Sequence, residues 1–104
     1  MTTAIFCNLS ALSPDQRRRH DGLAEHIFAQ VETVTELPNG YAFRLPLSMW
    51  TQAVEWVPLE RLCCPFFDFR LELRADGALW LSLTGPEGVK DLLRAEMQLG
   101  ENQG

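Results

Sequence analysis

The chain has 104 residues, a length that allows one hydrophobic core, so we expect a single domain over residues 1–104. Its composition, 46% hydrophobic and 22% charged, excludes an intrinsically disordered chain. The net charge of −5 argues against nucleic-acid binding, which depends on a basic surface. Neither a membrane span nor a signal peptide is recognisable, and we therefore expect a cytoplasmic protein with no membrane partner.

The first helix is predicted over residues 14–31. Ser13 and Gln16 form a capping box, and Pro14 suits the first helical position. Apolar side chains then recur at helical spacing: Leu23, Ala24, Ile27, Phe28 and Val31. Residues 4–9, before this helix, predict a short strand or an extended segment.

Two β-hairpins are predicted from alternating apolar and polar residues. The first joins residues 33–37 to residues 41–47 through a turn at Asn39-Gly40. The second joins residues 67–73 to residues 79–84 through Asp76-Gly77. Each strand alternates, which is typical of a sheet with one face buried and the other in water.

Two further helices are predicted between and after the hairpins. Ser48 can cap the second, Pro58 should kink or restart it, and Pro65 should end it near Cys64. Its apolar stripe is expected to be Trp50, Ala53, Val54 and Val57. The third follows the capping box of Thr84 and Glu87, places Val89, Leu92 and Leu93 on one side, and should end at Gly100.

The fold class expected from this order is α+β, with the elements arranged α-β-β-α-β-β-α. The simplest packing is a four-stranded antiparallel sheet, made from the two hairpins, with the three helices on one face. Residues 14–47 and 48–84 have the same order of elements, which suggests an αββ pseudo-repeat in topology.

Cys63 and Cys64 are adjacent at the predicted end of the second helix and are the main candidates for chemistry. Three cysteines without an export signal are expected to be free thiols rather than a disulfide framework. Neighbouring thiolates can bind a soft cation such as Hg, Cu or Zn, or a metalloid such as As. Glu60 and Arg61 lie within reach of Cys64 along the helix and would influence its pKa in opposite directions.

Cys7 and His20 are the further candidate metal ligands. If the segment before the first helix packs beside the end of the second, Cys7 joins the cysteine pair, and three sulfurs suit trigonal binding of a thiophilic ion. Zinc needs a fourth ligand, for which His20 is the candidate. The alternative for His20 is a histidine at the edge of the core, hydrogen-bonded to the backbone.

Two other functions fit the same cysteines. They could be packed in the core of a non-enzymatic interaction or regulatory module, or form a vicinal disulfide in a redox protein. Exposed aromatic residues could mark a homodimer or partner surface: Trp56, Phe66 and Trp80. The sequence contains no Ser/His/Asp arrangement and no nucleotide fingerprint, so it does not decide whether the protein is an enzyme. The run Arg17-Arg18-Arg19 is expected to be a solvated helix face.

Three segments resemble a family of small, uncharacterised bacterial proteins. They are Cys7-Asn8-Leu9-Ser10-Ala11-Leu12-Ser13, Glu60-Arg61-Leu62-Cys63-Cys64-Pro65-Phe66-Phe67, and Trp80-Leu81-Ser82-Leu83-Thr84-Gly85-Pro86-Glu87-Gly88-Val89-Lys90. Some members of that family lie near mercury or arsenic resistance determinants. The resemblance therefore implies that the protein handles thiophilic metals, with soft metal or metalloid ions as its partners.

Overall fold

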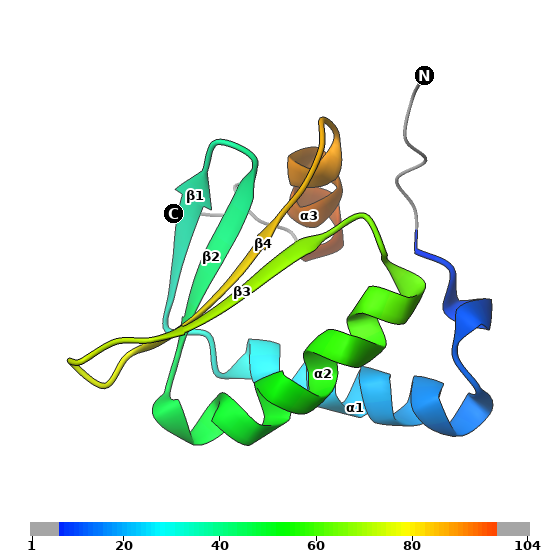
Figure 1. Ribbon diagram of the computed structural model, residues 1–104, viewed down its shortest axis with the longest axis horizontal. Helices are drawn as coiled ribbons and strands as arrows, with labels where there is room; N and C mark the ends of the chain where they lie inside the picture. Colours follow the sequence, from blue (N-terminus) through cyan, green and yellow to red (C-terminus); the bar gives the residue numbers. More distant parts are fainter. Residues whose placement is uncertain (1–6, 98–104) are drawn as a thin grey trace.

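The computed structural model describes residues 7–97, and over that range it has the predicted α+β architecture (Figure 1). The elements in chain order are the 3-10 turn η1 (Leu9–Ala11), α1 (Pro14–Ala29), β1 (Thr33–Leu37), β2 (Gly40–Leu45), η2 (Leu47–Met49), α2 (Trp50–Cys63), β3 (Asp68–Leu73), β4 (Leu79–Thr84) and α3 (Val89–Met97). The expected strand or extended segment at residues 4–9 lies partly, and the expected stop at Gly100 wholly, outside the described residues.

Helix α1 begins as its capping box predicts. Ser13 Oγ accepts a hydrogen bond from the Gln16 backbone N–H, and the Gln16 side chain accepts one from the Ser13 N–H. The helix ends at Ala29, two residues before the predicted boundary, and its buried residues include His20, Leu23 and Ile27. The apolar stripe therefore places a histidine in the core.

The four strands form one antiparallel sheet in the order β1-β2-β4-β3. Each hairpin pairs internally, and β2 joins them by pairing with β4, where Phe43 lies opposite Leu81. On β4, the buried residues Leu79, Leu81 and Leu83 alternate with partly exposed ones, as predicted. Gly77 has a φ of 88° in the second turn, a conformation that glycine adopts without strain.

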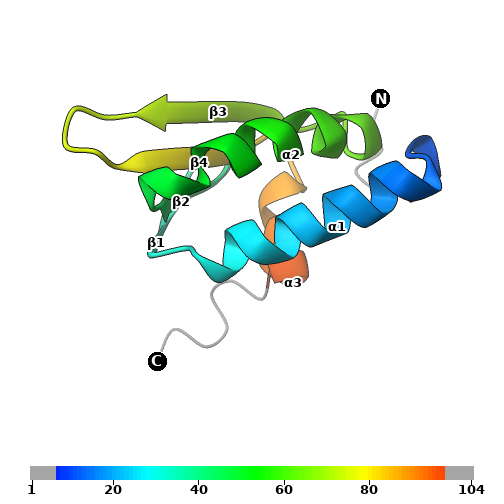
Figure 2. The same ribbon diagram turned by 90° about the horizontal axis from the view of Figure 1, so that it is seen from below.

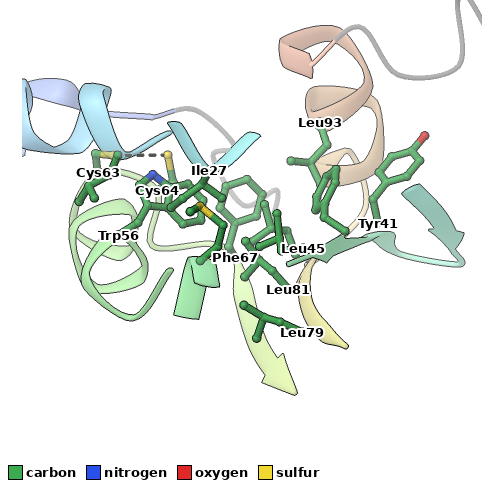
Figure 3. Close-up of a cluster of buried hydrophobic side chains, with 14 of the residues drawn as sticks. Ile27, Tyr41, Leu45, Trp56, Cys63, Cys64, Phe67, Leu79, Leu81 and Leu93 are labelled. Carbon is green, nitrogen blue, oxygen red and sulfur yellow. Dashed lines mark hydrogen bonds between the residues drawn. The ribbon is translucent and has the colours of Figure 1, made fainter. Parts of the chain in front are cut away.

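The helices lie on one side of this sheet, as Figures 1 and 2 show. Helix α1 packs against α2, and α3 packs against β2. The core fills the space between the two layers (Figure 3), and its largest fully buried side chains are Trp56, Phe43, Ile27, Leu45, Leu79, Leu81, Leu83 and Leu93. Burial of apolar surface from both layers is the main force that holds them together.

Helix α2 differs from its predicted form at its N-cap and in its apolar stripe. It runs through Pro58 without restarting, and Met49, not Ser48, occupies its N-cap position. The expected apolar stripe is also wrong, because Val54 and Trp50 are exposed. The buried residues are instead Ala53, Trp56, Glu60 and Cys63. Spacings of three and four residues fit both sets, and only contact with α1 and the sheet selects the second.

The burial of Trp56 also corrects the expected aromatic surface. Only 1% of Trp56 is exposed, so it belongs to the core and cannot contribute to a dimer interface. Trp80 is partly exposed, and the guanidinium carbon of Arg74 lies 5.0 Å from the centre of its ring. The third helix, expected to follow from the capping box of Thr84 and Glu87, begins at Val89.

Candidate thiol and metal-ligand site

The two neighbouring cysteines lie where α2 ends, and the end of the helix brings their sulfurs together. Cys63 is the last helical residue, and Cys64 leaves helical geometry, with φ −129° and ψ 69°. In a regular helix their side chains would diverge by about 100°. Here the two Sγ atoms lie 3.6 Å apart (Figure 3). The break before Pro65 therefore has the effect that the sequence suggested.

Cys7 reaches the same place from the N-terminal segment and forms a disulfide with Cys64. The Asn8 backbone N–H donates to the Cys63 carbonyl oxygen at 2.7 Å, which holds this segment against the end of α2. The expectation of three free thiols is therefore wrong for Cys7 and Cys64, and Cys63 is the free thiol. Cysteine spacing did not reveal the pairing because it depends on a contact across 57 residues.

His20 is brought to the cysteines by the packing of α1 on α2. Its Nε2 lies 2.6 Å from Oε1 of Glu60, and its Nδ1 lies 3.2 Å from Oδ1 of Asp21. Both His20 and Glu60 are buried. The hydrogen bond to Glu60 raises the pKa of His20, although burial opposes this effect. The hydrogen-bond partners of His20 are thus two carboxylates, and not the backbone as the structural alternative expected.

The Cys63 thiol points to the same carboxylate. Its Sγ donates to Oε1 of Glu60 at 3.6 Å and lies 3.5 Å from the Glu60 carbonyl oxygen. Burial, followed by the negative charge of Glu60, raises the pKa of Cys63 to about 11. At neutral pH this residue is therefore a protonated thiol, and a thiophilic ion must displace the proton to bind it.

Two overlapping sets of ligand atoms result, and each set lies within 4.8 Å. One is Cys7, Glu60 and Cys64; the other is His20, Glu60 and Cys63. The four predicted ligands, Cys7, His20, Cys63 and Cys64, thus converge around Glu60. Sulfur, imidazole and carboxylate are all ligands of zinc, and the sulfurs also suit softer ions. The first set can bind an ion only after the disulfide has been reduced.

Glu60 was not among the predicted ligands, although it lies at the centre of the site. The sequence indicated only that it could influence Cys64. The available signal was its spacing, because Glu60 falls seven residues after Ala53 and three before Cys63, on the buried face of α2. The second residue missed is Trp56, whose ring stacks near His20 with ring centres 6.1 Å apart.

The arginine run of α1 contributes to a solvated helix face, as expected. Arg18 pairs with Asp15 within the helix. Arg19 reaches Glu55 on α2, its Nε lying 2.5 Å from Oε2. These exposed pairs contribute little to stability.

The fold and the site together define a small α+β protein with a buried thiol, imidazole and carboxylate cluster beside a disulfide. In comparisons by sequence and by structure, the chain matches no protein-family model, no curated protein and no solved structure. Among residues 7–97, no helix has the length and apolar character needed to cross a bilayer.

Proposed function

We propose that the reduced protein binds a soft metal or metalloid ion through Cys63 and Cys64, with Cys7 as a third sulfur ligand. The observation that carries the proposal is the distance of 3.6 Å between the sulfurs of Cys63 and Cys64. Two thiolates, each about 2.3 Å from one tetrahedral ion, lie about 3.8 Å apart. The pair therefore already has the spacing that a shared ion requires.

The remaining groups favour a soft ion over a hard one. Cys7 is bonded to Cys64, so reduction would leave a third sulfur beside the pair. Three sulfur donors suit ions such as Hg(II), As(III) and Cu(I), whereas hard ions such as magnesium prefer oxygen ligands. The resemblance to proteins encoded near mercury or arsenic resistance determinants points to the same class of ion.

The disulfide makes binding depend on redox state. With Cys7 and Cys64 joined, Cys63 is the single free thiol, and reduction by a thiol or a dithiol restores the other two. Because cytosolic thiols are normally kept reduced, the cytoplasmic location that we propose would maintain the binding form.

The test is titration of the reduced protein with Hg(II), arsenite, Cu(I) and Zn(II). We expect one soft ion to bind per chain. The ultraviolet absorption of the thiolate–metal bonds measures this binding. The double variant Cys63→Ser with Cys64→Ser should lose binding while retaining its circular dichroism spectrum. Cys7→Ser should retain the affinity for ions that bind two sulfur ligands and should lower the affinity for ions that bind three. Unchanged affinity of the folded double variant for every ion would contradict the proposal.

A second function, thiol–disulfide exchange, is favoured by the position of the free thiol beside the disulfide. After losing its proton to Glu60 or to water, Cys63 could attack the Cys64 sulfur. The Cys63–Cys64 bond would form, the Cys7–Cys64 bond would break, and Cys7 would leave as a thiolate, with no net oxidation. The pKa of about 11 at Cys63 makes this exchange slow at neutral pH.

Peptide mapping of the oxidised protein decides between these disulfides. Detection of a Cys63–Cys64 disulfide together with a free Cys7 would favour exchange. An unchanging Cys7–Cys64 bond would leave metal binding, or a purely structural role for the cysteines in an interaction module, as the remaining functions. The metal titration separates these last two.

A further inference from the structure

A pocket of about 870 Å³ opens beside the cysteine cluster, between α1 and α3. Its floor and walls are largely apolar and include Ala24, Phe28, Val31, Val34, Phe43 and Met97. Cys63, Glu60 and His20 line it as well, so the ligand atoms of the proposed site and an apolar surface share one space. A bare ion needs no such surface, whereas an organic group does.

The charge around the pocket restricts what can enter it. Its lining includes the carboxylates of Asp21, Glu25, Glu60 and Glu96, and no lysine or arginine among the described residues. The basic side chain in this lining, His20, is already paired with Glu60, so an anion would still meet net repulsion. The pocket therefore favours an uncharged or cationic molecule and disfavours oxyanions and fatty acids.

Trp56 supplies a polar group that the fold leaves without a partner. Its Nε1 is buried and has no hydrogen-bond acceptor in the part of the chain that the structure describes. The residue lines the same pocket, and Figure 3 shows its nitrogen on the side of the ring towards Cys63 and Cys64. An unsatisfied buried donor is costly, so an acceptor on a bound molecule would gain from this position.

We propose that the pocket binds an uncharged trivalent metalloid compound carrying one apolar organic group, of the type R–As(OH)₂. This inference rests on the proposed function, because Cys63 and Cys64 would hold the metalloid atom while R lies on the apolar walls. The hydroxyl oxygens can accept from Trp56 Nε1 while the compound enters, before both As–O bonds are replaced by As–S bonds. The compound carries no charge, so the surrounding carboxylates do not repel it.

The binding step involves no change of oxidation state once the disulfide has been reduced by two equivalents of a thiol or by one dithiol. The S–H bonds of Cys63 and Cys64 and two As–O bonds break, and two As–S bonds form. Each thiol proton leaves with one hydroxide, so two water molecules are released. Arsenic remains trivalent and keeps its bond to carbon throughout.

The experiment compares phenylarsine oxide, arsenite and phenylarsonate on the full chain, reduced with a phosphine that is removed before titration. Burial of the phenyl group predicts that phenylarsine oxide binds at least about tenfold more tightly than arsenite. Phenylarsonate, a pentavalent anion, should not bind. Tight binding of phenylarsonate would overturn the argument from charge.

A variant that fills the pocket isolates the role of its walls. Ala24→Phe, on the pocket side of α1, should remove the preference for phenylarsine oxide over arsenite. Ala95→Phe, at an exposed position of α3 outside the pocket lining, is the matched control and should keep the preference. The Trp56 indole N–H signal in NMR should shift with phenylarsine oxide in the parent.

The outcomes separate this inference from the proposed function. Equal affinities of the parent for phenylarsine oxide and arsenite would overturn the pocket assignment while leaving thiol binding intact. No binding of any trivalent arsenical, Hg(II) or Cu(I) would overturn both. Retention of the phenyl preference in a folded Ala24→Phe protein would also contradict the pocket assignment.

Discussion

The Nε2 atom of His20 lies 2.6 Å from Oε1 of Glu60, and this contact joins α1 to α2 inside the core. It also places the imidazole and the carboxylate directly beside the Cys63 thiol, whose sulfur is 3.6 Å from the same carboxylate oxygen. A buried pair of this kind is costly to break, because removal of one partner leaves the other unsatisfied. It therefore fixes how the two helices meet at the site.

This pair predicts a stability that depends on pH. Since Glu60 raises the pKa of His20 above its unfolded value of about 6.5, the contribution is complete below that pH. It is lost as the pH rises through the folded pKa. Denaturant unfolding measured at increasing pH from about 6.5 should show this decline, and Glu60→Gln should reduce it. NMR titration measures the pKa of His20 directly. The variant His26→Gln identifies which imidazole signal belongs to His26.

The disulfide predicts a stability that depends on reduction. Closing a loop across 57 residues reduces the entropy of the unfolded chain. In the chain-entropy treatment this stabilises the fold by about 4 kcal/mol. Under oxidising conditions Cys7→Ser should lower the free energy of unfolding by up to about that amount. In excess reductant the variant and the parent should unfold at nearly the same denaturant concentration, and a difference of the same size there would contradict the prediction.

The Cys63 thiol is predicted to react slowly and with a steep pH dependence. With a pKa of about 11, about 0.1% of it is thiolate at pH 8. Alkylation of the oxidised protein by iodoacetamide should therefore accelerate about tenfold for each pH unit up to the pKa, while the fold persists. Glu60→Gln removes the adjacent negative charge and should raise the rate at pH 8. Rapid alkylation of the parent at pH 7, measured by mass spectrometry, would show that burial does not protect this sulfur.

Substitution of two glycines by alanine should change the stability of the protein in opposite directions. An added Cβ at Gly22, within α1, meets nothing within 4 Å. Gly22→Ala should therefore stabilise the helix by up to about 1 kcal/mol. At Gly40 the added atom would lie 1.9 Å from the Leu83 carbonyl oxygen, against the strand that pairs with it. Gly40→Ala should destabilise the protein by about 2 kcal/mol or more, and urea unfolding measures both.

Local sequence signals predicted most elements because each depends on neighbouring residues. The capping box at Ser13, the Asp76-Gly77 turn and the alternation along β4 all appear as expected. The predicted apolar stripe of α2 is wrong for a different reason. Val54 and Trp56 can each be placed on an apolar face by spacing, and packing against α1 and the sheet buries Trp56.

The sequence by itself determined the α+β class, a chain length that suits one hydrophobic core, the adjacent cysteines and the helix break that draws their sulfurs together. These features follow from chain length, hydrophobic period and the backbone restriction of proline, all of which act over a few residues. Only the tertiary structure decided the order β1-β2-β4-β3, the Cys7–Cys64 disulfide and the central position of Glu60. Those features depend on contacts between residues distant in the chain, which form when the helix layer closes on the sheet.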